Sequence, residues 1–432
     1  MPGVTTFRDR WQQGCCHRAY RDVFTASPGT LLHPASVRPD YKEENMHKIL
    51  TLNNISVAGL ERLPRDRYEV ASEMASPDAV LLRSYNMHDM DIPASVKAIG
   101  RAGAGVNNIP VDKMSKRGVP VFNAPGANAN AVKELVLAGM LMAARNLVQG
   151  WNFARGLSGD DSEISKQVES GKKNFAGMEL PGRTLGVVGL GAIGVQVANA
   201  AQALGMKVVG YDPDITVQSA WQMSSDVEQA GGIDDLLSQV DFVTFHVPLV
   251  DATRHMINAE RLRSMKDNVV LLNFSRNGII DDVAVVEALD EGKVYAYVCD
   301  FPSNLLKDHP RVVTLPHLGA STKEAEDNCA IMVADEIRDY LENGNVRNSV
   351  NFPKVYMKRN GGHRLAVVNE NVPNMLGQIS TTLADSGLNI IDMINKSRGE
   401  LAYTLVDVGS EVCQECVERI SATEGVLGVR VL

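Results

Sequence analysis

The fold of the central region is decided by residues 184–194, which read TLGVVGLGAIG. The apolar first half predicts a strand, and residues 195–204 after it predict a helix. Between them Gly189, Gly191 and Gly194 form a G-x-G-x-x-G pattern. In a strand-to-helix turn these glycines allow a tight turn, close backbone approach to a pyrophosphate, and close helix packing. The free N–H groups at the helix start favour phosphate, so the stretch indicates a dinucleotide site.

An acidic residue follows the next predicted strand, at the distance expected for ribose recognition. Residues 207–211 form that strand, and Asp212 comes directly after it. A carboxylate there accepts a hydrogen bond from a ribose 2′-OH and repels a 2′-phosphate. The sequence therefore favours NAD over NADP. The alternative is that Asp212 only caps the turn before Pro213.

Strand and helix patterns alternate on both sides of this motif, which indicates α/β architecture with parallel sheets. The central region has predicted strands at 184–190, 207–211, 242–246, 269–273, 294–300 and 312–315. An N-terminal series has predicted strands at 79–82, 96–101 and 119–123 and a long helix at 130–145. A second long helix is predicted at 325–343, and residues 156–177 appear polar and irregular in sequence, as expected for a surface connection. We expect two doubly wound, Rossmann-like domains.

The C-terminal region has a different pattern. After a breaker-rich linker at 353–362, residues 363–432 predict the order βαββαβ, which is a ferredoxin-like arrangement. A unit of about 70 residues is marginally stable alone, so it is expected to pair with a second copy.

Composition excludes several classes of protein. The 432 residues carry a net charge of −9, so no basic excess is available for general nucleic-acid binding. No apolar run reaches the roughly 18 residues of a membrane-spanning helix, and six cysteines in this length indicate reduced thiols in the cytoplasm. No metal-ligand pattern is convincing, because the Cys413–Cys416 C-x-x-C has no partner pair. Residues 1–45 follow no period and are expected to be a disordered extension or a misassigned start, with the fold beginning near Met46.

Two further motifs follow predicted strands, at the edge where α/β sheets bind ligands. In NFSRNG (273–278), Arg276 can grip a carboxylate through two N–H groups, unless it forms an ordinary surface salt bridge. In LPHLGAS (315–321), His317 can accept a hydroxyl proton near neutral pH, unless it is only structural. Both motifs together with the glycine turn indicate catalysis.

The three motifs in this order resemble the D-isomer-specific 2-hydroxyacid dehydrogenase family over about residues 46–352, and the C-terminal region resembles an ACT domain. The resemblance implies a discontinuous substrate-binding domain (46–145 and 325–352), an NAD-binding domain (146–324) and a regulatory ACT domain (363–432). It also implies a homodimer or homotetramer. The implied reaction is hydride transfer from C2 of D-3-phosphoglycerate to NAD, which begins serine biosynthesis. Another D-2-hydroxy acid, or a non-catalytic NAD(H)-sensing protein, are the alternatives.

The resemblance also implies roles for individual residues. Arg276 would hold the substrate carboxylate and His317 would be the acid/base. The implied cofactor contacts are Gly189, Gly191, Ala192, Ile193, Gly194, Asp212, His246, Val247, Pro248, Ser275, Arg276, Asp300, His317 and Gly319. The implied substrate contacts are Arg83, Ser84, Gly103, Ala104, Gly105, Asn107 and Arg276, with Arg83 a candidate for the phosphate.

Two departures from the family pattern affect the expectations. Asn304 stands about where the family has the glutamate that orients the histidine; an amide can fix the ring but cannot stabilise an imidazolium as an anion does. In the ACT-like region, Asn371 and Asn389 match asparagines that bind serine in allosteric relatives, but Asn369 stands where a histidine is common. Regulation by L-serine is therefore left open.

Overall fold

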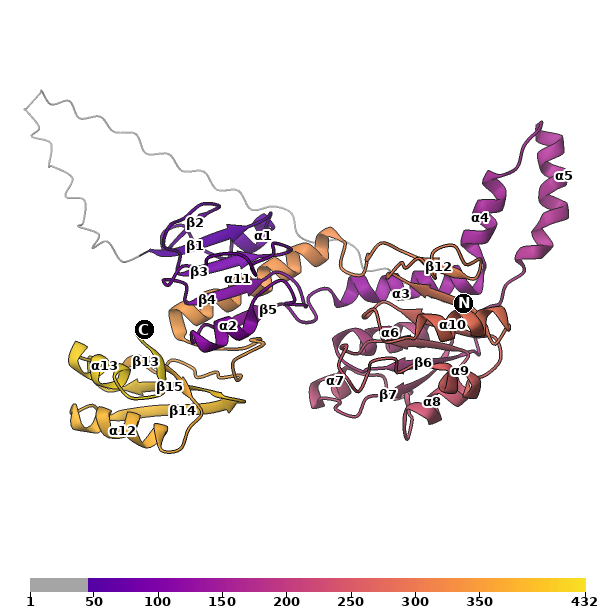
Figure 1. Ribbon diagram of the computed structural model, residues 1–432. Coiled ribbons are helices and arrows are strands. Elements are labelled where there is room, and N and C mark those ends of the chain that lie inside the picture. The colour runs from indigo at the N-terminus through magenta and orange to yellow at the C-terminus, as the bar shows by residue number, and fades with distance from the viewer. Residues whose placement is uncertain (1–45) are drawn as a thin grey trace, which may run out of the picture. The chain divides into compact units, whose positions relative to one another are not determined.

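The computed structural model describes residues 46–432, and the prediction made for residues 1–45 lies outside this range. Within the described range no helix is both long and apolar enough to cross a membrane. The described residues form three sheets (Figure 1).

The first sheet has five parallel strands in the order β2-β1-β3-β4-β5. Its strands are β1 (His47–Leu52), β2 (Tyr68–Ala71), β3 (Ala79–Leu82), β4 (Ala98–Arg101) and β5 (Val121–Asn123). Its helices are α1 (Val57–Leu60), α2 (Val111–Lys116) and α11 (Lys323–Asn343). Side chains of α11 and of α2 belong to separate hydrophobic clusters, so helices cover both faces of this sheet.

The second sheet has seven parallel strands and carries the glycine turn. Its strands are β6 (Thr184–Val188), β7 (Lys207–Tyr211), β8 (Glu228–Gln229), β9 (Phe242–Phe245), β10 (Val269–Asn273), β11 (Val294–Cys299) and β12 (Val312–Thr314). The order β12-β11-β10-β9-β6-β7-β8 is the dinucleotide-binding order with one added edge strand. From β6 the chain adds strands first on one side (β7, β8) and then on the other (β9 to β12). Such sheets bind ligands at this switch point, between β6 and β9.

Helices cover both faces of this sheet as well. One hydrophobic cluster includes residues of α3 (Ala129–Ala144) and α6 (Ala192–Ala203). The other includes residues of α8 (Ile233–Gln239), α9 (Ala259–Ser264) and α10 (Asp282–Asp290), while α7 (Val217–Gln222) lies after β7. The predicted α/β fold class, with two doubly wound parallel sheets, is confirmed.

The expectation that residues 156–177 are irregular is wrong. Helices α4 (Leu147–Arg155) and α5 (Asp161–Gly171) form a hairpin that continues into the 3₁₀ turn η1 (Lys172–Phe175) (Figure 1). Phe153 and Phe175 pack with ring centroids 5.1 Å apart. Asp160 and Glu163 form a capping box that starts α5, which supplies the helix signal in an otherwise polar segment.

The third sheet is antiparallel and follows the predicted βαββαβ order. Its elements are β13 (His363–Glu370), α12 (Met375–Asp385), β14 (Ile390–Arg398), β15 (Leu401–Val408), α13 (Gln414–Ser421) and β16 (Val426–Val431). The strand order is β14-β15-β13-β16. We call residues 363–432 the C-terminal unit.

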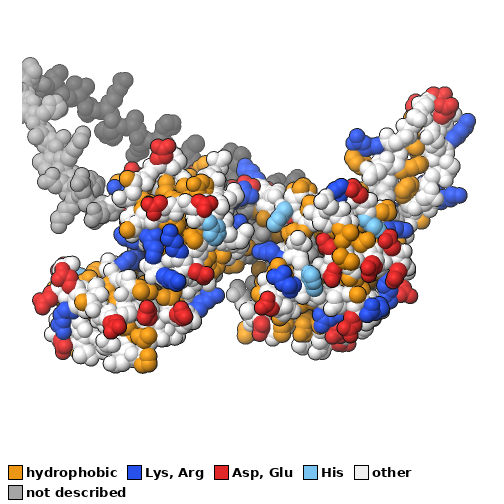
Figure 2. Space-filling model, viewed as in Figure 1, with side chains coloured by type: hydrophobic (Ala, Val, Ile, Leu, Met, Phe, Trp, Pro, Cys, Tyr) orange, Lys and Arg blue, Asp and Glu red, His pale blue; other side chains and the backbone are white. Residues whose placement is uncertain are grey.

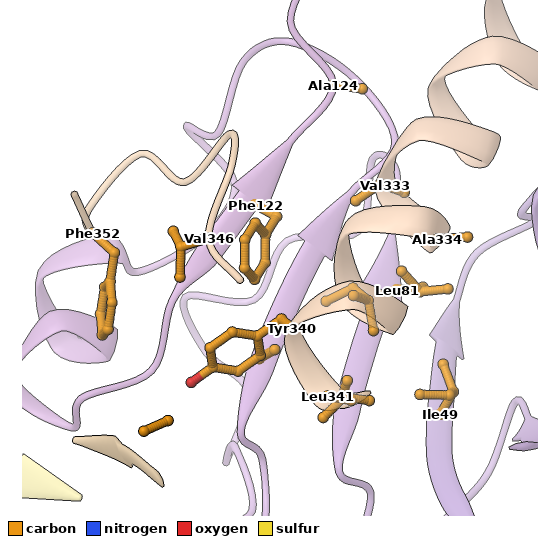
Figure 3. Close-up of a cluster of buried hydrophobic side chains, with 14 of the residues drawn as sticks. Ile49, Leu81, Phe122, Ala124, Val333, Ala334, Tyr340, Leu341, Val346 and Phe352 are labelled. Atoms are coloured by element: carbon orange, nitrogen blue, oxygen red, sulfur yellow. The ribbon is translucent and has the colours of Figure 1, made fainter. Parts of the chain in front are cut away.

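The C-terminal unit packs on the first sheet's α11 rather than standing as a separate body. Leu401, Tyr403 and Leu405 of β15 belong to the cluster that contains Tyr340 of α11 and Phe352. Figure 3 shows Tyr340 and Phe352 among the buried side chains of this cluster. The alternate residues Val406 and Val408 belong to a second cluster with α12 and α13. Because β15 is buried on both faces, packing within the same chain contributes to the stability of this unit. Its pairing with a second copy stays a prediction. Acidic and basic side chains are intermixed on the face seen in Figure 2.

Candidate functional site

One cavity of about 390 Å³ collects residues from the loops that follow strands of both parallel sheets. From the second sheet come the turns after β6, β9, β10 and β11 and the segment that contains His317. From the first sheet come Ala104, after β4, and residues after β5. The predicted residues that line it are Ala104, Gly191, Ala192, Ile193, His246, Val247, Pro248, Ser275, Arg276, Asp300, His317 and Gly319.

The glycine turn has the geometry that its sequence predicts. Gly189 has φ +90°, and a Cβ there would lie 2.5 Å from the carbonyl oxygen of His246. A Cβ on Gly194 would lie 1.9 Å from the carbonyl oxygen of Gly189, so only glycine fits. At Gly191 a Cβ would meet no atom within 4 Å, and no side chain caps the helix that begins at Ala192. The first N–H groups of α6 therefore have no side-chain cap, and Gly191, Ala192 and Ile193 line the cavity, as a phosphate site requires.

Asp212 is held by the turn that it follows. Its carboxylate accepts hydrogen bonds from the backbone N–H of Leu190 (2.7 Å) and of Asp214 (2.9 Å). These contacts are the ones expected if Asp212 only caps the turn before Pro213. Each carboxylate oxygen still has a lone pair that could accept a hydrogen bond from a ribose hydroxyl, so ribose binding stays a prediction.

Two buried polar atoms in this region lack hydrogen-bond partners among the described residues. They are Nδ1 of His246 and Oδ1 of Asp300. His246 shares a hydrogen bond between Nε2 and Thr244 (3.1 Å), and burial lowers its pKa to about 3, so the ring is neutral. Burial raises the pKa of Asp300, while the Gly319 N–H, 3.1 Å from Oδ2, and the nearby His317 act in the opposite direction. Unsatisfied buried polar atoms are costly, so these two fit the binding of a polar group such as a nicotinamide amide.

His317 has an unusual backbone conformation for a non-glycine residue, with φ +49°. Its N–H donates to the carbonyl oxygens of Asp300 and Leu315, both at 3.1 Å. The ring packs edge-on against Phe301 with centroids 5.3 Å apart. A left-handed residue beside a cavity is a feature of functional sites.

No carboxylate is hydrogen-bonded to the His317 ring within residues 46–432. Asn304 is exposed and makes no side-chain hydrogen bond to the histidine. Asp308, another acid in this segment, pairs with Lys307. The glutamate of the family pattern therefore has no evident substitute in this arrangement.

Three arginines meet beside the cavity. Arg101 donates from Nε to the carbonyl oxygen of Arg83 (3.0 Å), and a Cβ on Gly105 would lie within 3.8 Å of both Arg101 and Arg276. Burial lowers the pKa of Arg101, and the positive charges of Arg276 and Arg83 lower it further. Glu326 pairs with Arg83 at 2.6 Å. The cluster therefore has an excess of positive charge that suits an anionic ligand.

The loop between the arginines is fixed by the first sheet. Asn123, at the end of β5, donates from its side chain to the carbonyl oxygen of Ala104 at 2.5 Å. Arg101 Nη1 would lie 2.6 Å from a Cβ on Gly103, so a side chain there would displace the guanidinium. Asn107 Oδ1 lies 3.6 Å from the Cβ position of Gly105.

Known proteins are similar to this chain in sequence and in fold. Residues 137–319 match the family described as D-isomer specific 2-hydroxyacid dehydrogenase, NAD binding domain. A D-3-phosphoglycerate dehydrogenase of Haemophilus influenzae is 30% identical over 78% of this chain and 81% of its own length. The chain belongs to the D-isomer specific 2-hydroxyacid dehydrogenase family.

Other members of the family extend this comparison. A D-3-phosphoglycerate dehydrogenase of Methanocaldococcus jannaschii is 37% identical over 79% of this chain, but the chain spans only 63% of that protein. The NAD⁺-bound 3-phosphoglycerate dehydrogenase of Entamoeba histolytica is 25% identical, with a TM-score of 0.55, and the match covers 71% of this chain and 98% of that one. The predicted family is confirmed, and the matched segment contains the glycine turn, Arg276 and His317.

The sequence interpretation missed Arg101. Arg101 is the last residue of β4 and immediately precedes the loop predicted to contact the substrate. Its place at the carboxyl end of a strand was the signal that could have identified it. Ser84 is exposed and does not line the cavity. Asn371 and Asn389 are both exposed in the C-terminal unit, where the Asn371 side chain donates to the carbonyl oxygen of Gly399 (3.1 Å).

Proposed function

We propose that this protein oxidises D-3-phosphoglycerate to 3-phosphohydroxypyruvate with NAD. The observation that carries the proposal is the single cavity that brings Arg276 and His317 together with the glycine turn. The adjoining arginine cluster suits a substrate with two anionic groups. The names of the relatives support a phosphorylated substrate.

The chain's own groups suffice for substrate binding and proton transfer. The guanidinium of Arg276 holds the carboxylate and draws electron density from the C2 oxygen. An imidazole nitrogen of His317 accepts the proton that the C2 hydroxyl loses. Arg101 and Arg83 hold the phosphate, with Glu326 limiting the local charge.

NAD fits the other side of the cavity. We propose that its pyrophosphate lies on the N–H groups from Gly191 to Ile193, its ribose near Asp212, and its amide near Asp300. When bound, NAD supplies the acceptor for the hydride from C2. The residues that line the cavity hold C2 of the substrate next to the hydride acceptor of NAD.

A substrate panel tests this proposal. The full chain is assayed by absorbance at 340 nm with D-3-phosphoglycerate, D-glycerate and D-lactate, each with NAD and with NADP. We expect NAD-dependent turnover that prefers the phosphorylated acid. Preference for an unphosphorylated acid would favour another dehydrogenase activity. NADH binding without any turnover would favour a sensing protein and contradict the proposal.

Arg101→Ala is expected to raise KM for D-3-phosphoglycerate about 10- to 100-fold. A charge-assisted hydrogen bond contributes about 1.5–3 kcal/mol, and the loss falls on substrate binding. Steady-state kinetics with D-3-phosphoglycerate and D-glycerate measure the effect. Arg65→Ala, a change before β2, is the control. Equal losses for both substrates would show that Arg101 does not contact the phosphate.

Asn304→Glu is expected to raise the acid-side pKa of the kcat/KM profile by about one unit. The family pattern has the glutamate that orients the histidine at about this position, and a carboxylate that reaches an imidazole favours the charged ring. The pH–rate profile from pH 5 to 10 measures the shift, and Asn304→Gln is the uncharged control. An unchanged profile would show that position 304 does not face the histidine.

We also propose the predicted domain boundaries, a homodimer or homotetramer, a cytoplasmic location, and serine binding at Asn371 and Asn389. Exposed Leu147 and Trp151 on α4 support self-association. The four described cysteines are free thiols, which supports a reducing compartment.

A further inference from the structure

A second, larger cavity of about 930 Å³ runs along α11. Its walls come from α11, residues 345–348 and residues 356–359, together with Arg62 and the turn after β5. It shares only Gly126 with the cavity that contains His317. The proposed dehydrogenase reaction assigns no role to it.

Glu336 of α11 lines this cavity and is incompletely satisfied. The residue is 5% exposed, and its Oε1 accepts a hydrogen bond from Asn348 at 2.5 Å. Its Oε2 is buried and has no hydrogen-bond partner among the described residues. Leaving a buried acceptor unpaired costs about 1–3 kcal/mol, so a donor supplied by a ligand would be stabilised here.

The carboxyl group of Glu336 has no ion-pair partner among the described residues, because the arginines near it pair with other acids. Arg62 pairs with Asp335 at 2.8 Å, and Arg347 lies 3.3 Å from Asp339. Burial raises the pKa of Glu336 to about 8; Asp335 adds to this, whereas Asn348 and Arg347 act against it. At neutral pH the carboxyl is thus largely protonated.

The rest of the wall carries more basic than acidic groups. The basic residues are Arg62, Arg338, Arg347, Lys358 and Arg359, and the other acids are Asp335, Asp339 and Glu342. The Arg347 guanidinium also stacks over the ring of Tyr356, 4.7 Å from its centroid. A ligand that places an acidic group near these cations and a donor on Glu336 would use both features.

We propose that this cavity binds a small amino acid-like zwitterion, with its ammonium group on Glu336 and its carboxylate on Arg347. This inference does not depend on the proposed reaction. The ammonium supplies the donor that Oε2 lacks. The carboxylate meets Arg347, which stacks on the ring of Tyr356 and would share its charge between the ligand and Asp339, 3.3 Å away.

Calorimetric titration of the full chain with L-alanine at pH 7 tests the proposal. An ammonium beside Glu336 lowers its pKa, so binding should release up to about one proton per ligand. Two buffers with different ionisation enthalpies measure that release. Ethylamine, which lacks the acid, and acetate, which lacks the amine, should each bind at least tenfold more weakly.

Variants locate the site. Glu336→Gln should weaken L-alanine binding at least tenfold and abolish proton release. Arg347→Ala should weaken L-alanine but leave ethylamine unchanged, and it is about half exposed, so it provides a test even if Glu336→Gln does not fold. Asn389→Ala should have no effect. No binding, or binding that Asn389→Ala removes and the two cavity variants do not, would overturn the proposal.

Discussion

His317→Ala is expected to lower kcat about 10²- to 10⁴-fold while NADH still binds. General-base assistance has that magnitude, and alanine leaves no group to receive the hydroxyl proton. Arg276 and the glycine turn are untouched by the change, so substrate and cofactor affinity should fall much less than kcat. Steady-state turnover and NADH fluorescence titration measure the two quantities separately.

The matched control is His363→Ala, which removes an exposed histidine at the start of β13. It should leave both kcat and NADH affinity within about twofold of the unsubstituted protein. Added imidazole should partly restore turnover to His317→Ala, because the truncated side chain opens onto a cavity. Near-normal kcat in His317→Ala would reject the acid/base role.

The parallel sheets could be predicted because their strands are continuous apolar runs with breakers at both ends. Strands β7 and β10 lie within the predicted bounds. Buried parallel strands have no polar face, so their bounds are clear in the sequence. Helix α5 was not predicted because it lacks a buried apolar stripe, having only Gly171 buried.

The packing of the C-terminal unit on α11 could not be predicted from local patterns. Its two clusters divide the odd and even residues of β15 between different partners. A strand that is apolar on both faces indicates two covering layers, but not which segments supply them. Helix α11 of the same chain covers one face of β15, and pairing of the unit with a second copy stays a prediction.

The candidate site likewise has residues that local sequence patterns predict and residues that only tertiary packing brings together. The meeting of Arg276 and His317 in one cavity could be predicted because each follows shortly after a strand of one sheet, and parallel strands bring their carboxyl ends to one edge. Arg101 belongs to the other sheet, and its approach to Arg276 depends on tertiary packing. Glu336 gave no sequence signal, because an acid within a charged helix appears solvent-exposed in sequence.

The other large expected effect concerns the ion pair that joins the C-terminal unit to α11. Arg364 and Asp407 are fully buried and form two hydrogen bonds of 2.6 and 2.7 Å. The guanidinium also donates to the carbonyl oxygens of Asn343 (3.0 Å) and Met357 (2.9 Å). Arg364 therefore links β13 to the end of α11 and to the linker.

Asp407→Ala is expected to destabilise the protein by about 3–5 kcal/mol, because it leaves the Arg364 charge buried and unpaired. Urea unfolding, monitored by hydrogen exchange in β13 and β15, measures the loss where it occurs. The control is Asp385→Ala, which breaks the exposed pair with Arg419 (3.3 Å) and should cost about 1 kcal/mol or less. The double variant Arg364→Met/Asp407→Leu removes both charges and should recover part of the lost stability, because apolar replacements of buried pairs are often tolerated. The recovery should be incomplete, because the carbonyl oxygens of Asn343 and Met357 lose their donor. If Asp407→Ala cost no more than Asp385→Ala, the pair would not hold the C-terminal unit on α11. The apolar packing of Tyr340 against Tyr403, and hydrogen bonds such as that from Arg430 to the Tyr340 carbonyl oxygen (3.0 Å), would then carry that role.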